Sequence, residues 1–207
     1  MSKLIFNLAM VLDRPTGISN YATNLLPYLG PLNPTLLTAH GDDRYDCYPI
    51  PPNLSPDRGT LGHGRRLIWT QTQLPQIYRQ LRSSLLFSPL PEAPLFTTCR
   101  YVAMVHDFIP VRFPRWRSPL TYYAKYYIPA VARQAVHLVC NSQSTADDLI
   151  RFAQVPAAKI TPIPLGYDHQ HFRPAPHQSH SPHYFLYIGR SDPHKNLDRL
   201  VKSFCRS

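Results

Sequence analysis

The residues best suited to chemistry are His106 and Asp107, which directly follow an apolar run at 101–105. A run this short, with two valines, predicts a strand buried on both faces of a parallel sheet. Ligands of such sheets bind beyond the carboxyl ends of the strands, so chemistry is expected at this pair. The alternative is a polar strand exit, in which Asp107 makes a turn and His106 packs as a core histidine.

The elements around this pair repeat one pattern, in which an apolar run is followed by a turn and a helix. Strands are expected at 4–9, 35–39, 84–88, 101–105, 136–140 and 160–165, and helices at about 18–29, 65–82, 119–134 and 144–153. Residues 41–64 are polar and rich in proline, so a long loop is expected there. Pro75 and Pro129 are expected to split or kink their helices. Residues 144–147 are typical of a capping box. The alternation predicts an α/β fold with a parallel sheet.

Two turns have residues that suit an anion. Gly17 stands between the first strand and its helix, where a glycine lets backbone amides approach a ligand, although a lone glycine is also typical of a plain tight turn.

The second turn contains Arg190 and Lys195, which lie between another apolar run at 184–188 and a helix expected from Leu197 onward. Two cations beside a helix N-terminus suit a diphosphate; the alternative is two solvated surface charges.

The charge is strongly positive and unevenly spread. The formal net charge is +10, and residues 101–207 hold 13 of the 22 lysines and arginines but 6 of the 12 acids. Such a field favours a nucleotide diphosphate, an anionic membrane or a nucleic acid as partner. Arg112, Arg115, Trp116 and Arg117 mix basic and aromatic side chains, which suits membrane headgroups or single-stranded nucleic acid. No nucleic-acid module is recognisable, so no nucleic-acid partner is expected.

Cysteine and hydropathy patterns predict a cytoplasmic protein without a metal. The four cysteines lack a Cys-x-x-Cys spacing, which argues against a zinc site and fits reduced thiols. The histidines within 169–183 lie among prolines and serines and predict a linker, not a metal site. Residues 4–12 lack the features of a signal peptide, and no run approaches the ~20 apolar residues of a membrane span.

Four stretches of the sequence, taken together and in this order, resemble the motifs of a glycosyltransferase of the group 1, family 4 type. The resemblance rests on 15–21, on 105–110 with 113–114, on 139–145 followed by 163–168 and 172–174, and on 187–197. It implies a GT-B architecture of two facing Rossmann-like domains, the first a mostly parallel sheet with helices on both faces. Residues 1–168 would form the acceptor-side domain, 169–183 a linker, and 184–207 the first βα unit of the donor-binding domain.

The same resemblance implies sugar transfer from a nucleotide-sugar to a sugar or lipid-linked acceptor. The anomeric configuration would be retained, and neither a metal nor another cofactor would be needed. Gly17 would back the donor phosphates, and His106 would face the transferred sugar, with Asp107 positioning His106 or its loop. Arg190 and Lys195 would neutralise the leaving diphosphate. Polysaccharide biosynthesis at the inner face of a membrane is the implied setting. The basic and aromatic side chains of Arg112, Arg115, Trp116 and Arg117 are, by their own chemistry, the candidate membrane or acceptor face.

The chain departs from the family pattern in two places. Thr16 and Ser19 flank Gly17, where the family commonly has more glycines. The family's later glutamate pair has no counterpart, since the only glutamate is Glu92. We therefore expect a truncated chain that is inactive until a donor domain is supplied, for instance by a separate polypeptide. The rival hypothesis is a non-catalytic module that uses its basic aromatic face on anionic lipid or on a protein partner.

Overall fold

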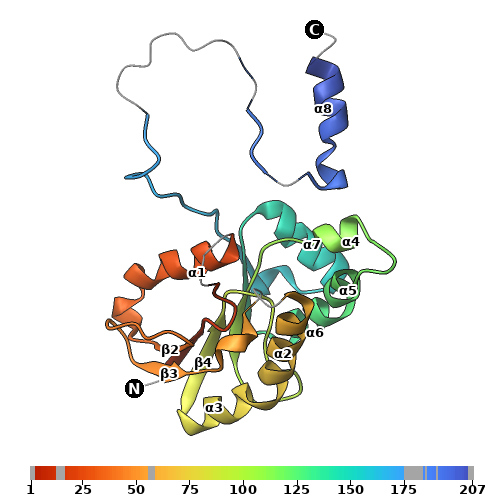
Figure 1. Cartoon of the computed structure of the whole chain (residues 1–207). Coiled ribbons are helices and arrows are strands. Elements are labelled where there is room, and N and C mark those ends of the chain that lie inside the picture. Colours follow the sequence, from red (N-terminus) through yellow and green to blue (C-terminus); the bar gives the residue numbers. More distant parts are fainter. Residues whose placement is uncertain are drawn as a thin grey trace. The chain divides into compact units, whose positions relative to one another are not determined.

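The computed structural model describes residues 3–12, 17–55, 59–174, 184, 186–189 and 191–204. The chain divides into two compact units, residues 1–165 and residues 166–207 (Figure 1). The domain boundaries expected from the sequence, at 168 and 183, stay predictions.

The first unit is built on a parallel sheet in the order β3-β2-β1-β4-β5-β6-β7 (Figure 1). Its strands are β1 (Lys3–Asn7), β2 (Thr35–Thr38), β3 (Cys47–Pro49), β4 (Ser83–Ser88), β5 (Tyr101–Val105), β6 (His137–Cys140) and β7 (Ile160–Pro162). All six neighbouring pairs are parallel, which confirms the Rossmann-like α/β fold. The strand order reverses between β1 and β4, and ligands of open α/β sheets bind at the carboxyl ends of the strands beside such a reversal.

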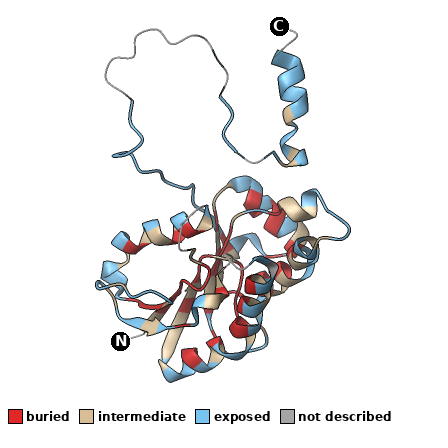
Figure 2. Ribbon diagram, viewed as in Figure 1, coloured by how far each residue is buried: buried red, intermediate tan, exposed pale blue. Residues whose placement is uncertain are grey.

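Helices cover both faces of the sheet because buried side chains alternate along its strands. Ile5 and Leu37 belong to the larger hydrophobic core, whereas Phe6 and Leu36 belong to a second core. The second core is closed by α1 (Ile18–Leu25), and the larger one by α2 (Gly59–Thr72), α3 (Leu74–Gln80), α6 (Ile128–Gln134) and α7 (Gln143–Ala153). Figure 2 shows the buried residues gathered on the strands and on the inner sides of these helices.

Prolines interrupt the helices where the sequence predicts. Pro75 lies in the first turn of α3, just after α2 ends. Around Pro129 the helix continues but changes pitch, since α5 (Pro119–Tyr122) passes into a π-helical turn, η5 (Tyr123–Tyr127), before α6. Proline has no N–H to donate to the preceding turn, which explains the wider turn before Pro129.

Two expectations about local structure in the first unit are wrong. Residues 41–64 are not one loop, because they contain β3, a 3-10 turn (η3, Pro52–Leu54) and the start of α2. The β3 sequence has no apolar run, and the strand is defined by its pairing with β2.

The helix α7 is capped by Ser142, and not by the predicted Ser144. The Ser142 Oγ accepts a hydrogen bond from the Thr145 amide at 3.2 Å. Ser142 has the extended backbone that a cap requires, with φ −158°.

The second unit contains a 3-10 turn, η7 (Pro193–Lys195), and the helix α8 (Leu197–Phe204). The strand expected at 184–188 is not formed at the described residues 184 and 186–188. A strand needs a hydrogen-bonded neighbour, and no other strand lies in the described part of 166–207. None of the helices in the described ranges is long and apolar enough to cross a membrane.

Candidate functional site

His106 lies at the carboxyl end of β5, where three neighbouring elements meet. Its Nε2–H donates to the Pro89 carbonyl, 2.9 Å away in the loop after β4. The ring lies nearly perpendicular to that of Tyr21 of α1, at an angle of 84° and with 5.2 Å between the ring centroids. Because a carbonyl oxygen only accepts, the Pro89 bond assigns the ring proton to Nε2 and leaves Nδ1 as the acceptor of the neutral ring.

Burial decides the charge of this imidazole. It lowers the pKa of His106 below its ordinary value, because desolvation disfavours the imidazolium. The hydrogen bond to Pro89 and the negative charge of Asp107 act in the opposite direction but are smaller. The ring is therefore neutral at pH 7, in the form that accepts a hydrogen bond from a hydroxyl.

Asp107 shapes the chain after the strand. Its Oδ1 accepts from the Ile109 amide at 3.0 Å, at the start of α4 (Ile109–Arg112). On the other side, the His106 carbonyl accepts from Thr145 Oγ1 of α7 at 3.2 Å. The carboxylate of Asp107 therefore bonds to its own loop. This geometry favours a role in positioning that loop, and not a direct hydrogen bond to the His106 ring.

Gly17 begins α1 with a backbone that only glycine adopts freely, at φ 48° and ψ −111°. A Cβ at this position would meet no atom within 4 Å, so conformation and not space calls for glycine. Ser19, in the first turn of α1, accepts from the Leu12 amide at 3.2 Å and ties the exit of β1 to the helix. Residues 13–16, which complete the glycine loop, lie outside the described residues.

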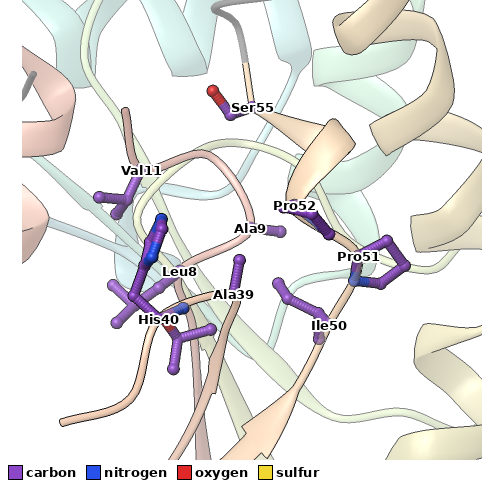
Figure 3. Close-up of a pocket in the computed structure, with 10 residues that line it drawn as sticks. Leu8, Ala9, Val11, Ala39, His40, Ile50, Pro51, Pro52 and Ser55 are labelled. Atoms are coloured by element: carbon purple, nitrogen blue, oxygen red, sulfur yellow. The ribbon is translucent and has the colours of Figure 1, made fainter. Parts of the chain in front are cut away.

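A pocket that the sequence patterns do not predict lies at the same edge of the sheet, beside β1, β2 and β3 (Figure 3). Its lining consists of Leu8, Ala9, Val11, Thr38, Ala39, His40, Ile50, Pro51, Pro52 and Ser55. His40 and Ser55 are the labelled lining residues with polar side chains (Figure 3). His40 follows β2 much as His106 follows β5, so the rule that selected His106 could also have selected His40.

A buried ion pair that the sequence patterns do not predict includes Glu92 of the loop that carries Pro89. Arg66 of α2 donates to Glu92 from Nε at 2.6 Å and from Nη2 at 2.9 Å, and its Nη1 donates to the Leu54 carbonyl at 3.1 Å. Tyr123 donates to Glu92 Oε1 at 3.2 Å. Burial raises the pKa of Tyr123 well above its ordinary value, so its hydroxyl remains a donor. The network joins α2, the chain after β3, the chain after β4 and the π-helical turn.

The residues predicted to form a basic aromatic face separate into two groups. Arg112 is engaged within the fold, because its Nε and Nη2 each donate to Asp148 of α7 at 2.7 Å. Trp116 is 89% exposed, and Arg115 and Arg117 are exposed as well. Arg112 therefore joins α4 to α7 through an ion pair, although its side chain is still 46% exposed.

This geometry does not test two predictions. One is that Arg190 and Lys195 neutralise a diphosphate, and the other is that the site needs no metal. Lys195 is exposed at the end of η7, and its amide donates to the Asp192 carbonyl at 2.9 Å. Arg190 lies outside the described residues. Within the part of the chain that the structure describes, no three His, Cys, Asp or Glu side chains are grouped to hold a metal ion.

The parallel sheet defines a Rossmann-like α/β protein. His106 lies at its carboxyl edge, where ligands of such sheets bind. The family model for Glycosyltransferase Family 4 matches residues 15–171, which is well over half of the chain. The chain therefore belongs to Glycosyltransferase Family 4, as its motifs predict. No curated protein matches the sequence at a significant level.

Proposed function

We propose that this chain is the acceptor-side part of a retaining, metal-independent glycosyltransferase. It would help to move a sugar from a nucleotide-sugar to a sugar or lipid-linked acceptor, in polysaccharide biosynthesis. Family membership supports sugar transfer in general. The placement of His106 carries the proposal, because a neutral imidazole, fixed by the Pro89 carbonyl, stands at the carboxyl edge of the sheet.

In the proposed reaction, the bond between sugar C1 and the diphosphate oxygen breaks, and its electron pair leaves with the diphosphate. The acceptor oxygen forms a bond to C1 on the same face, and the acceptor proton passes to the released phosphate. His106 accepts a hydrogen bond from a sugar hydroxyl at Nδ1 and holds the ring while positive charge develops at C1. Gly17 lets the first amides of α1 approach the donor phosphates.

The departing diphosphate needs positive charge, which we assign to Lys195 and Arg190. The described part of 166–207 contains one helix and one 3-10 turn, and no sheet that would hold a nucleotide. We therefore propose that a donor-binding half must be added, from further sequence or from a separate polypeptide. The chain alone would bind nucleotide-sugars only weakly, with Kd of about 1 mM or above.

We also propose a cytoplasmic location. Cys47, Cys99 and Cys140 are free thiols, and disulfides are rare in reducing compartments. Cell fractionation against markers of each compartment tests this, and recovery with secreted proteins contradicts it.

Histidine-ring NMR on the full chain tests the proposed sugar contact, because it detects weak binding. Nucleotide-sugars and the matching nucleoside diphosphates are titrated into the labelled chain, and the His106 signal is assigned by its loss in His106→Asn. We expect this signal to move with the nucleotide-sugars and much less with the sugar-free ligands. His137 serves as the control, since it lies at the amino end of β6 and bonds to Thr161.

Two results contradict the proposal. Equal movement of the His106 signal with and without the sugar would place no sugar at this ring. Micromolar binding of a nucleotide-sugar to the chain alone, measured by calorimetry, would remove the need for a donor-binding half.

A further inference from the structure

Most side chains of residues 113–126 are exposed, and we call the surface that they form the ridge. Its exposed large apolar side chains are Phe113 (55%), Trp116 (89%), Leu120 (53%), Tyr122 (53%) and Tyr126 (59%). Arg115, Arg117 and Lys125 add exposed positive charge. The sequence contains no acidic residue from 108 to 146. In Figure 1 the chain between α4 and α5 projects away from the sheet, and Figure 2 shows it as largely exposed.

Internal contacts hold the ridge in one shape. The Arg115 amide donates to Thr121 Oγ1 at 3.1 Å, and the Tyr122 hydroxyl donates to the Trp116 carbonyl at 3.2 Å. The rings of Tyr122 and Tyr126 stack with 6.4 Å between centroids, and Lys125 Nζ lies 5.4 Å from the Tyr126 ring centroid. A surface that is already ordered loses less conformational entropy when it binds a partner.

The ridge lies toward the edge of the sheet that carries His106. β5 and α4 leave the sheet at its carboxyl edge, and the chain from α5 to α6 then returns to the amino edge, where β6 begins. The first turns of this helical stretch are therefore nearer to the carboxyl edge. A surface bound by the ridge would lie on the side where an acceptor reaches His106.

We propose that the ridge docks this protein on an anionic phospholipid bilayer. Tryptophan and tyrosine side chains favour the level of the headgroups, and nearby lysines and arginines are attracted to anionic lipids. No acidic side chain within 108–146 opposes this attraction. Single-stranded nucleic acid is usually bound along a groove. A Trp116 that is 89% exposed at a projecting turn suits a flat bilayer better. Docking does not depend on the proposed sugar transfer.

Vesicle flotation of the full chain tests the proposal. One set of vesicles is phosphatidylcholine alone, and the other contains about one part in three of phosphatidylglycerol. We expect binding to the anionic vesicles, weak binding to the neutral ones, and release as salt approaches about 1 M. Arg115→Gln with Arg117→Gln should lower the partition coefficient on anionic vesicles about 30-fold. Trp116→Ala should lower it about tenfold.

Matched controls make the same change of charge, and remove one exposed aromatic ring, at the amino edge of the sheet. Arg79→Gln with Arg100→Gln removes two exposed cations that precede β4 and β5. Phe96→Ala removes a ring that is 92% exposed, from a residue whose amide donates to Gln134 at the end of α6. We expect less than about a threefold change in each control. Near-UV circular dichroism of every variant verifies that the fold is retained.

Three results overturn the proposal. The first is no binding of the folded chain to anionic vesicles at low salt. The second is equal loss of binding in the ridge variants and in the amino-edge controls, which would indicate net charge alone. The third is binding to single-stranded DNA or to an acidic protein, with none to vesicles.

Discussion

Arg66 donates two hydrogen bonds to Glu92, at 2.6 and 2.9 Å, and both side chains are almost wholly buried. A buried charge pair costs desolvation that is offset only while both partners are present. Glu92 stands three residues after Pro89, whose carbonyl orients His106. The pair that stabilises the core therefore lies beside the loop that fixes the candidate catalytic ring.

Removing either partner of this pair should be strongly destabilising. Glu92→Met or Arg66→Met leaves a buried charge unpaired, and each should lower the free energy of unfolding by about 3–5 kcal/mol. The double substitution should cost less than the sum, by about 1–3 kcal/mol, because no charge is then left alone. Urea denaturation of the two single variants and the double variant measures this coupling. Strict additivity would show that the pair does not act as a unit.

Tyr123→Phe should lower the free energy of unfolding by about 1.5 kcal/mol, since it removes a hydrogen bond to the Glu92 carboxylate. Tyr126→Phe is the matched control, because Tyr126 is 59% exposed in the same π-helical turn, and we expect about zero change. Thermal unfolding of both variants provides the comparison. Equal effects would mean that the bond to Glu92 contributes nothing.

Gly17→Ala should destabilise the chain by about 1–3 kcal/mol, because an L side chain is strained at φ 48° and ψ −111°. Gly30→Ala is the control: a Cβ there also meets no atom within 4 Å, but the backbone is not left-handed. Denaturant midpoints of the two variants test the difference. A neutral Gly17→Ala would show that the loop rearranges without cost.

Ser142→Ala should cost about 1 kcal/mol, because it removes the side-chain acceptor at the start of α7. Ser144→Ala should cost clearly less, since that serine does not cap the helix. Guanidinium titrations distinguish the two positions. A larger loss at Ser144 would restore the capping box that the sequence predicted.

Stability should fall as the pH is lowered from about 7 to about 5. Burial holds the pKa of His106 below its ordinary value, so in this range the unfolded chain binds a proton that the folded chain does not. Burial lowers the pKa of His63 in the same direction. His106→Asn should therefore flatten the dependence but not abolish it. Urea denaturation across this pH range is the measurement, and an unchanged slope would exclude His106 as a contributor.

Short-range pattern was enough to predict every strand of the sheet except β3, and to select His106 as the main candidate residue. The apolar runs at β1, β2, β4 and β5 are local signals, because a strand buried on both faces needs nearly continuous apolar side chains. The rule that ligands bind at carboxyl strand ends then selected His106 without any contact information.

The sequence by itself determined the α/β class, the family and the strand-end position of His106, because these depend on residues that are neighbours along the chain. Only the tertiary structure decided the tautomer of His106, the Arg66–Glu92 pair and the Arg112–Asp148 pair. Their partners lie 17, 26 and 36 residues apart. The packing of loops and helices around the sheet determines which side chains meet, and composition and periodicity do not encode it. The same packing pairs Arg112 with Asp148 and leaves Trp116 exposed.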